Sequence, residues 1–188
     1  EIYRLQIENL RLKDIDKENK RLRDLLELKQ RKEYDFTVAK VSFRDPQNIY
    51  SLLYIDKGEK DGIKKDMVVL NKNMLLGKIT EVNYDNAKVE IITKKGNNTS
   101  VITEDGNNLA VLRGEGNSTM TLEYLVAEVK VKKGDMIVTS GISDIYPRNI
   151  FVGKISDGKD NGDNLFKTEE IKIPYSILSV EEVVILKR

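Results

Sequence analysis

The residue types that most often carry out enzyme chemistry are missing from this chain. Its 188 residues include no histidine and no cysteine. Histidine is the usual general base and zinc ligand, and cysteine supplies thiolates and disulfides, so Ser-His-Asp and Cys-His arrangements are excluded. We therefore predict that the chain is not an enzyme and has no catalytic, cofactor-binding or metal-binding residues.

One serine stands where a β-barrel hydrolase would place its nucleophile. Ser140 follows Thr139 and precedes Gly141, and it would need a base to remove its proton. No histidine is present for that role, and no lysine is singled out by its position. We interpret the segment as a strand end that turns at Gly141, and a hydrolase with Ser140 as nucleophile is kept as a third hypothesis.

A polar segment at 157–164 partly resembles a calcium-binding loop. On the EF-hand spacing, Asp157 and Asn161 fall at ligand positions. Lys159 and Thr168 occupy two further ligand positions where a carboxylate is expected. We therefore interpret 157–164 as a solvated hairpin loop.

The charges of the chain almost cancel. Lys and Arg number 32 and Asp and Glu number 31, which leaves a net charge of +1. Nucleic-acid binding needs a strong basic excess, so we predict no nucleic-acid partner. No apolar run approaches the roughly 18 residues that span a bilayer. The chain starts at Glu1 without a methionine or a capping residue, and we expect its first helix to be cut from a longer one.

The first 33 residues predict one long helix. They contain no glycine or proline and are rich in Leu, Glu, Lys, Arg and Gln, which favour helices. Apolar residues and two asparagines recur in steps of three and four, the rhythm of a coiled coil, with one extra step of three that overwinds the supercoil. This narrow stripe suits pairing with a second copy, with the asparagines fixing the register; the alternative is a helix lying on its own domain. The predicted dimer interface is Ile2, Leu5, Asn9, Leu12, Ile15, Asn19, Leu22 and Leu26.

After the helix, short β-branched and aromatic segments alternate with turn residues, which predicts a mainly β fold. About six strands are expected before residue 105 and about six after it. Their regular spacing indicates small barrels or sandwiches. We predict a helix over 1–34, a first β domain over 35–105 and a second over 106–188, whose last strand returns to the first domain in one alternative. The expected strands are 36–43, 50–55, 67–70, 75–82, 88–93, 99–103, 109–113, 119–124, 136–140, 150–155, 165–173 and 180–186.

Several turn motifs, taken in order, resemble one family. The resemblance is to the rod-shape-determining MreC family, and it covers nearly the whole chain. Tyr146 stands where that family usually has Phe. The motifs are Asp45-Pro46, Ile55-Asp56-Lys57-Gly58, Asp61-Gly62-Ile63, Gly77-Lys78-Ile79, Leu122-x-Tyr124-Leu125, Lys133-Gly134-Asp135, Val138-Thr139-Ser140-Gly141, Tyr146-Pro147 and Gly153-Lys154-Ile155.

The resemblance implies a fold, a location and a role. It implies a single-pass membrane protein whose helix continues as a dimerising coiled coil. Two small six-stranded β-barrels would follow on the outer side of the bacterial cytoplasmic membrane, in a chymotrypsin-like arrangement without its catalytic triad. The role would be a scaffold of the cell-elongation machinery that positions peptidoglycan synthesis enzymes, with a class B penicillin-binding transpeptidase and the membrane protein MreD as partners.

Two sets of residues are predicted to serve this architecture. Glycines are expected where strands turn, because a side chain there would be strained. Partner binding would then fall on exposed apolar side chains or strand edges. The expected structural turns are Gly58, Gly62, Gly77, Gly134, Gly141 and Gly153. The expected partner surface is Leu122, Tyr124, Ile142, Ile145, Tyr146 and Phe151.

A second hypothesis is an adaptor-type structural protein of a membrane transport complex, such as an efflux-pump adaptor, which also joins a coiled coil to β domains. That architecture needs a second antiparallel helix of similar length. No second stretch of the sequence has the helical pattern of 1–33. The scaffold is therefore the leading prediction.

Overall fold

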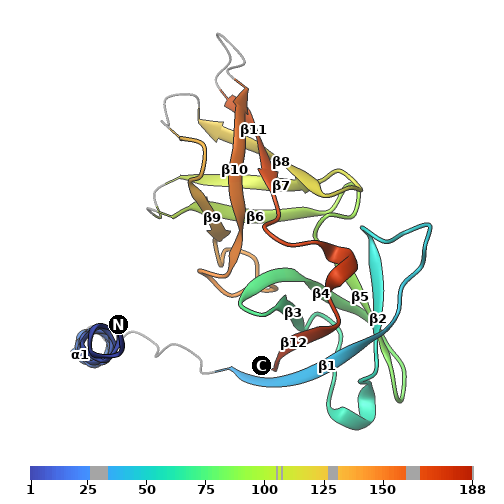
Figure 1. The fold of residues 1–188 in the computed structure, drawn as a ribbon, viewed down its shortest axis with the longest axis horizontal. Coiled ribbons are helices and arrows are strands. Elements are labelled where there is room, and N and C mark those ends of the chain that lie inside the picture. Colours follow the sequence, from blue (N-terminus) through green and yellow to red (C-terminus); the bar gives the residue numbers. More distant parts are fainter. Residues whose placement is uncertain (26–33, 105, 107, 127–130, 160–165, 188) are drawn as a thin grey trace. The chain divides into compact units, whose positions relative to one another are not determined.

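The computed structural model describes residues 1–25, 34–104, 106, 108–126, 131–159 and 166–187. It separates into two compact units, Glu1–Tyr34 and Asp35–Arg188, and each is described by itself. The first contains the helix, and the second contains the strands that the described residues form (Figure 1).

The first unit contains helix α1, Ile2–Leu25. Its residues are good helix formers, and Leu5 donates the first helical hydrogen bond to the carbonyl of Glu1 at 3.1 Å. Glu18 and Arg21, one turn apart, form an exposed ion pair at 2.7 Å. The helix was predicted to reach residue 33, and 26–33 lie outside the described residues.

The second unit is built from β-strands, which confirms the prediction of a mainly β chain with one N-terminal helix. Each predicted strand overlaps an observed one. Two 3₁₀ turns, Glu59–Asp61 and Ile177–Ser179, were not predicted. The strands are β1 (Asp35–Phe43), β2 (Leu52–Ile55), β3 (Val68–Asn71), β4 (Met74–Val82), β5 (Ala87–Ile91), β6 (Asn98–Thr103), β7 (Leu109–Gly114), β8 (Thr119–Val126), β9 (Met136–Thr139), β10 (Phe151–Lys159), β11 (Phe166–Lys172) and β12 (Glu182–Lys187).

Six of these strands close into a barrel. They follow one another in the order β4, β3, β12, β1, β2 and β5, and pairing of β5 with β4 closes the ring. The last strand lies between the first and the third: Val184 faces Val38 of β1 and Leu70 of β3. The guanidinium of Arg44 donates to the carbonyl oxygens of Leu178 and Val180, which holds the returning chain in place.

The remaining strands pair in the order β11, β8, β7, β6, β9 and β10, and β10 also pairs with β11. A single parallel pair, Phe151 with Met74, links β10 to β4 of the barrel. Figure 1 shows these six strands in the upper part of the view and the barrel strands below them. The pairings of two strands extend across the predicted boundary at residue 105: β6 pairs with β7 and β9, and β12 pairs with β1 and β3.

The core is apolar and follows the alternation of the strands. Along β5, Ala87, Val89 and Ile91 are fully buried, while the residues between them are half-buried. Each buried branched side chain contributes roughly 1.5–3 kcal/mol relative to an exposed one. The 157–164 loop was predicted to begin at Asp157, but β10 continues to Lys159 because 157–159 pair with β11. Residues 160–165 lie outside the described part.

Candidate interaction surfaces

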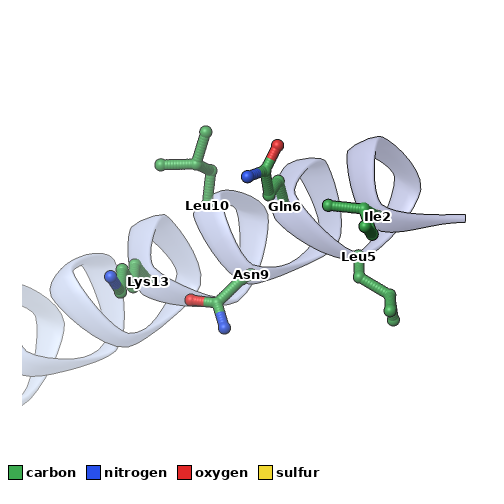
Figure 2. Close-up of a pocket in the computed structure, with 6 residues that line it drawn as sticks. All are labelled: Ile2, Leu5, Gln6, Asn9, Leu10 and Lys13. Carbon is green, nitrogen blue, oxygen red and sulfur yellow. The ribbon is translucent and has the colours of Figure 1, made fainter.

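The apolar stripe of α1 is open to solvent within its unit. Ile2, Leu5, Leu12 and Ile15 are 72, 59, 60 and 56% exposed, and Asn9 is exposed with them. Figure 2 shows Leu5 and Asn9 projecting from one side of the helix. A row of exposed aliphatic side chains at helical spacing is typical of a surface that another helix covers.

The rest of the predicted stripe is less fully described. Asn19 and Leu22 lie on α1, but their side chains are outside the described set, and Leu26 lies outside it altogether. Three further exposed apolar residues, Tyr3, Ile7 and Leu10, were not predicted. They repeat at i, i+4 and i+7, and Figure 2 shows Leu10 pointing away from the side that carries Leu5.

The six predicted partner-surface residues differ in their exposure to solvent. Tyr124 and Ile142 are 60 and 67% exposed, as a partner surface requires. Leu122 is completely buried, and Tyr146 is 5% exposed, so placing these two on a surface was wrong. Leu122 points inward because it lies at a core-facing position of β8. The other two, Ile145 and Phe151, are half-buried.

Tyr124 owes its exposure to a β-bulge in β8. Leu125 faces Lys167 and Leu122 faces Glu169, so two residues of β8 oppose one residue of β11 between these pairs. Tyr124 has a positive φ of 61°, which is rare for a bulky residue and carries backbone strain. Bulges redirect side chains, and this one turns Tyr124 outward.

Tyr146 belongs to a buried contact between the two sets of strands. Burial raises the pKa of its hydroxyl, and the negative charge of Glu90 raises it further. A hydrogen bond with the Thr99 side chain acts in the opposite direction. Tyr146 therefore ties the loop that follows β9 to β6 and to the barrel strand β5.

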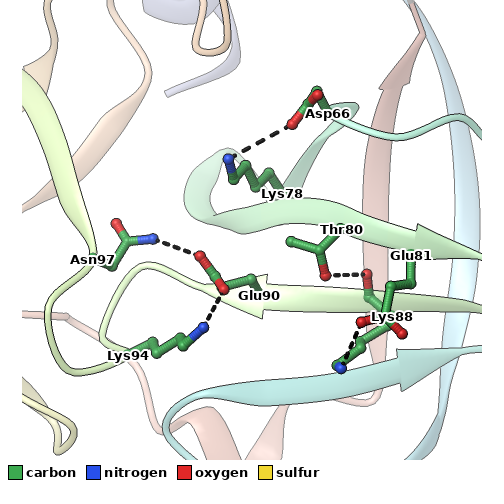
Figure 3. Close-up of polar contacts among 8 residues, drawn as sticks. All are labelled: Asp66, Lys78, Thr80, Glu81, Lys88, Glu90, Lys94 and Asn97. Carbon is green, nitrogen blue, oxygen red and sulfur yellow. Dashed lines mark hydrogen bonds and ion pairs between the residues drawn. The ribbon is translucent and has the colours of Figure 1, made fainter.

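Glu90 is the centre of a group of polar contacts on the barrel (Figure 3). Lys94 and Asn97 donate hydrogen bonds to its two carboxylate oxygens. Burial alone would raise the pKa of Glu90, but these contacts outweigh it and hold the pKa below its ordinary value. On the same sheet, Lys78 lies 3.6 Å from Asp66.

The contacts of Ser140 are those of a structural residue. Its side chain is 4% exposed. The hydroxyl donates to the carbonyl of Ser100 at 3.1 Å and accepts from the backbone N–H of Ile142 at 3.3 Å. Both roles of the hydroxyl are thus used to hold the turn at Gly141, as the strand-end interpretation predicts.

The predicted glycines fall into two groups. Gly62, Gly134 and Gly141 lie in turns with φ of 78, 97 and 72°. Gly77 and Gly153 lie inside β4 and β10 instead of at turns. A Cβ on Gly77 would lie 1.9 Å from the carbonyl oxygen of Glu90, so the neighbouring strand approaches too closely for any side chain.

Gly58 lies beside a turn and is also closely approached by a neighbouring segment of backbone. It precedes the 3₁₀ turn at Glu59–Asp61 with an extended backbone, φ −139°. A Cβ there would lie 2.4 Å from the carbonyl oxygen of Asn83. The Asp61 carboxylate accepts from the Gly58 N–H at 3.1 Å and from Lys57 Nζ at 3.0 Å. The turn is therefore specified by packing and hydrogen bonds together.

A family model matches most of the strand-bearing unit. It is described as "Rod shape-determining protein MreC, barrel core", and it matches residues 41–187. The chain belongs to the MreC family. The cell shape-determining protein MreC of Listeria monocytogenes is 32% identical over 181 residues, which cover 93% of this chain and 61% of that protein.

Solved MreC structures have the same fold. The MreC of Listeria monocytogenes superposes with a TM-score of 0.87 at 30% identity, covering all of this chain and 92% of that one. A complex between penicillin-binding protein PBP2 and MreC from Helicobacter pylori also matches, with a TM-score of 0.63 at 14% identity, covering 83% of this chain and 100% of that one. At that identity the second likeness concerns the fold alone.

This MreC chain spans less than two thirds of the length of the first curated relatives it matches, 61 and 66%. Among the residues that the structure describes, no helix combines the length and the apolar character that crossing a bilayer requires. The same residues contain no cluster of three or more side chains suited to holding a metal ion.

Proposed function

We propose that this chain is the extracytoplasmic part of a membrane-anchored, non-enzymatic scaffold that controls bacterial cell shape by positioning peptidoglycan synthesis enzymes. Membership of the cell shape-determining MreC family is the observation that carries the proposal. The bonded, buried hydroxyl of Ser140 agrees with a structural role for the segment that a hydrolase would use.

The proposed partner is a class B penicillin-binding transpeptidase. The related Helicobacter pylori MreC was solved in complex with the penicillin-binding protein PBP2, which supports a partner of this class. The exposed side chains of Tyr124 and Ile142 are the candidate contacts that remain from the predicted surface. MreD, implied by the family resemblance, is proposed as the partner within the membrane.

The proposed architecture is a dimer with two barrels in each copy. The exposed stripe of α1 supplies the pairing surface, as a parallel coiled coil. The second set of strands acts as a barrel domain of its own, because its last strand in the order, β10, also pairs with its first, β11. Two copies on one coiled coil would present two transpeptidase-binding surfaces side by side.

The test of pairing is the mass of the 188-residue chain in solution. We expect sedimentation equilibrium to give a dimer, and Leu5→Asp with Leu12→Asp to give a monomer, since charges cannot be buried in the seam without a large cost. Arg4→Asp with Lys17→Asp, also on the exposed helix surface but off the stripe, is the matched control and should stay dimeric. A stripe variant that keeps the mass of the unchanged chain would contradict pairing through α1.

The test of partner choice uses the extracytoplasmic domain of the class B transpeptidase from the same organism. We expect the immobilised chain to bind this domain, and Tyr124→Ala with Ile142→Ala to weaken binding without lowering stability. A class A synthase domain serves as the control partner. Equal binding of both enzymes would contradict the proposed specificity.

A further inference from the structure

A hollow opens on the outside of the first barrel, where β1 and β2 meet the turn between β4 and β5. Its volume is about 450 Å³, within the range of small-ligand sites. The neighbouring residues of β2, Leu53 and Ile55, are completely buried, so the strand alternation turns the residue between them outward. The hollow is lined by Ser42, Phe43, Tyr54, Asp56, Asp85 and Asn86.

An aromatic pair forms one wall of the hollow. The rings of Phe43 and Tyr54 lie with their centroids 5.7 Å apart and their planes at 51°. The pairing of β1 with β2 is irregular between Val41 and Phe43, and such an irregularity redirects the following side chain. Phe43 is 56% exposed. A tilted, solvent-facing aromatic pair offers ring faces, which attract organic cations.

Two carboxylates flank the rings, and both are held in place. One oxygen of Asp56 accepts from the backbone N–H of Lys40 at 2.8 Å. One oxygen of Asp85 accepts from the Asn86 amide at 2.8 Å, and Asn86 in turn accepts from Asn83 at 2.8 Å. Among the described residues, no donor reaches the second oxygen of either carboxylate.

Two lysines that neighbour these aspartates in sequence are paired with other acids. Lys57 Nζ lies 3.0 Å from Asp61, and Lys88 Nζ lies 2.9 Å from Glu81. Within the described part of the chain, Asp56 and Asp85 make no ion pair within 4.0 Å. The charge of Asp56 acts on Lys57, but neither aspartate is held in an ion pair. The hollow therefore joins two available carboxylates to aromatic surface.

We propose that this hollow binds a basic side chain, arginine above lysine, presented by a partner protein. A guanidinium can lie against an aromatic ring while its planar fork donates to carboxylates, which an ammonium does less well. Two carboxylates without a third ligand are too few for a metal site built from the described residues. The inference rests on the proposed scaffold role, which supplies protein partners.

The test measures binding of simple probes to the full 188-residue chain by NMR. N-acetyl-arginine amide should shift the backbone amide signals of Phe43, Tyr54 and Asn86 in a saturable way, with a Kd of about 1–10 mM, as expected for one side chain. N-acetyl-citrulline amide has the same shape without the charge and should bind roughly tenfold more weakly or not at all. Tri-N-acetylchitotriose, a wall-glycan analogue, should leave these signals unchanged.

Matched variants locate the binding. Asp56→Asn with Asp85→Asn should weaken arginine binding about five- to tenfold, because both charge-assisted contacts are lost. Glu104→Gln with Glu115→Gln removes two exposed charges outside the hollow and should change nothing. Phe43→Leu keeps apolar volume and tests the ring face.

Three results would overturn the inference: no saturable shift with the arginine probe, equal binding of the citrulline probe, or shifts unaffected by the aspartate variant. Saturable binding of the glycan analogue in the same hollow would replace the protein partner with a sugar. None of these results alters the mass of the chain or its binding of the transpeptidase domain. The scaffold role is therefore tested independently of this hollow.

Discussion

Tyr146 combines a loop position with the environment of a core residue. Its ring is 5% exposed. Its hydroxyl lies against Thr99 of β6, in its own set of strands, and the charge of Glu90 on the barrel strand β5 acts on it. The neighbouring Thr139 hydroxyl donates to the carbonyl of Pro147, which also holds the loop down. The Tyr146-Pro147 motif therefore fastens the two sets of strands together.

Removing the ring of Tyr146 should cost stability rather than binding. We expect Tyr146→Ala to lower the free energy of unfolding by about 3 kcal/mol or more, since a large buried side chain is lost. Tyr146→Phe should cost about 1 kcal/mol, the value of one hydrogen bond. Urea unfolding followed by circular dichroism measures both. Ile142→Ala, in the same loop but exposed, is the control, and an equal loss for Ile142→Ala would contradict the anchor.

Glu90 should make the free energy of unfolding depend on pH in the acidic range. Its pKa is lowered in the folded chain, so the unfolded chain binds the proton more readily. The stabilisation is therefore complete above about pH 4.3, the ordinary pKa, and is lost as the pH falls through the lower folded pKa. Glu90→Gln should cost about 1 kcal/mol at pH 7 and clearly less at pH 3. Urea midpoints at both pH values test this, and an equal loss at both would count against it.

Strands β4 and β5 can approach each other closely because Gly77 of β4 has no side chain. The backbone of Gly77 faces Ile91 in β5 and Val69 in β3. The carbonyl oxygen of Glu90 fills the space that a Cβ would need. Any side chain at this position would therefore have to displace the backbone of β5.

Gly77→Ala should therefore destabilise the barrel more than the same change at a glycine with open space around it. We expect a loss of about 3 kcal/mol or more, because a buried backbone has to shift. Gly96→Ala provides the comparison. Gly96 has a φ of 79°, and nothing lies within 4 Å of the added Cβ. Only the left-handed backbone conformation should then lower the free energy of unfolding, by about 1–2 kcal/mol. Thermal unfolding ranks the two, and the reverse order would refute the steric argument.

The elements show which parts of this fold can be predicted from sequence. Strands such as β4 and β5 were predicted because they alternate and end at Asn, Asp and Gly turns, which are local signals. The inside position of Gly77 and the burial of Tyr146 were not predicted, because each depends on a segment distant in sequence. The hollow at Phe43 was missed for the same reason, since β1, β2 and the turn before β5 supply its walls.

In the whole molecule, the pairing of the last strand joins the two ends of the β unit. β12 fills the place between β1 and β3, and Tyr175 donates to the carbonyl of Leu75 at 3.2 Å as the chain approaches it. The predicted first domain, 35–105, contains neither element. It also ends with β6, whose partners β7 and β9 lie beyond it.

A fragment covering 35–105 should therefore not fold alone. Without β12, both β1 and β3 have an unpaired edge, and such edges favour association. We expect the fragment to lack a cooperative urea transition and to aggregate, whereas 35–188 should unfold cooperatively. Circular dichroism and light scattering on the two fragments decide this. A sharp transition in 35–105 would show that the barrel closes without its last strand.

The place of β12 also has a consequence during synthesis. A ribosome makes β1 and β3 long before β12, so the ring stays open until β12 itself has been made. Until then the nascent polypeptide exposes a gap that chaperones would have to shield. A premature stop anywhere before β12 would thus leave the earlier strands β1 and β3 without the partner that lies between them.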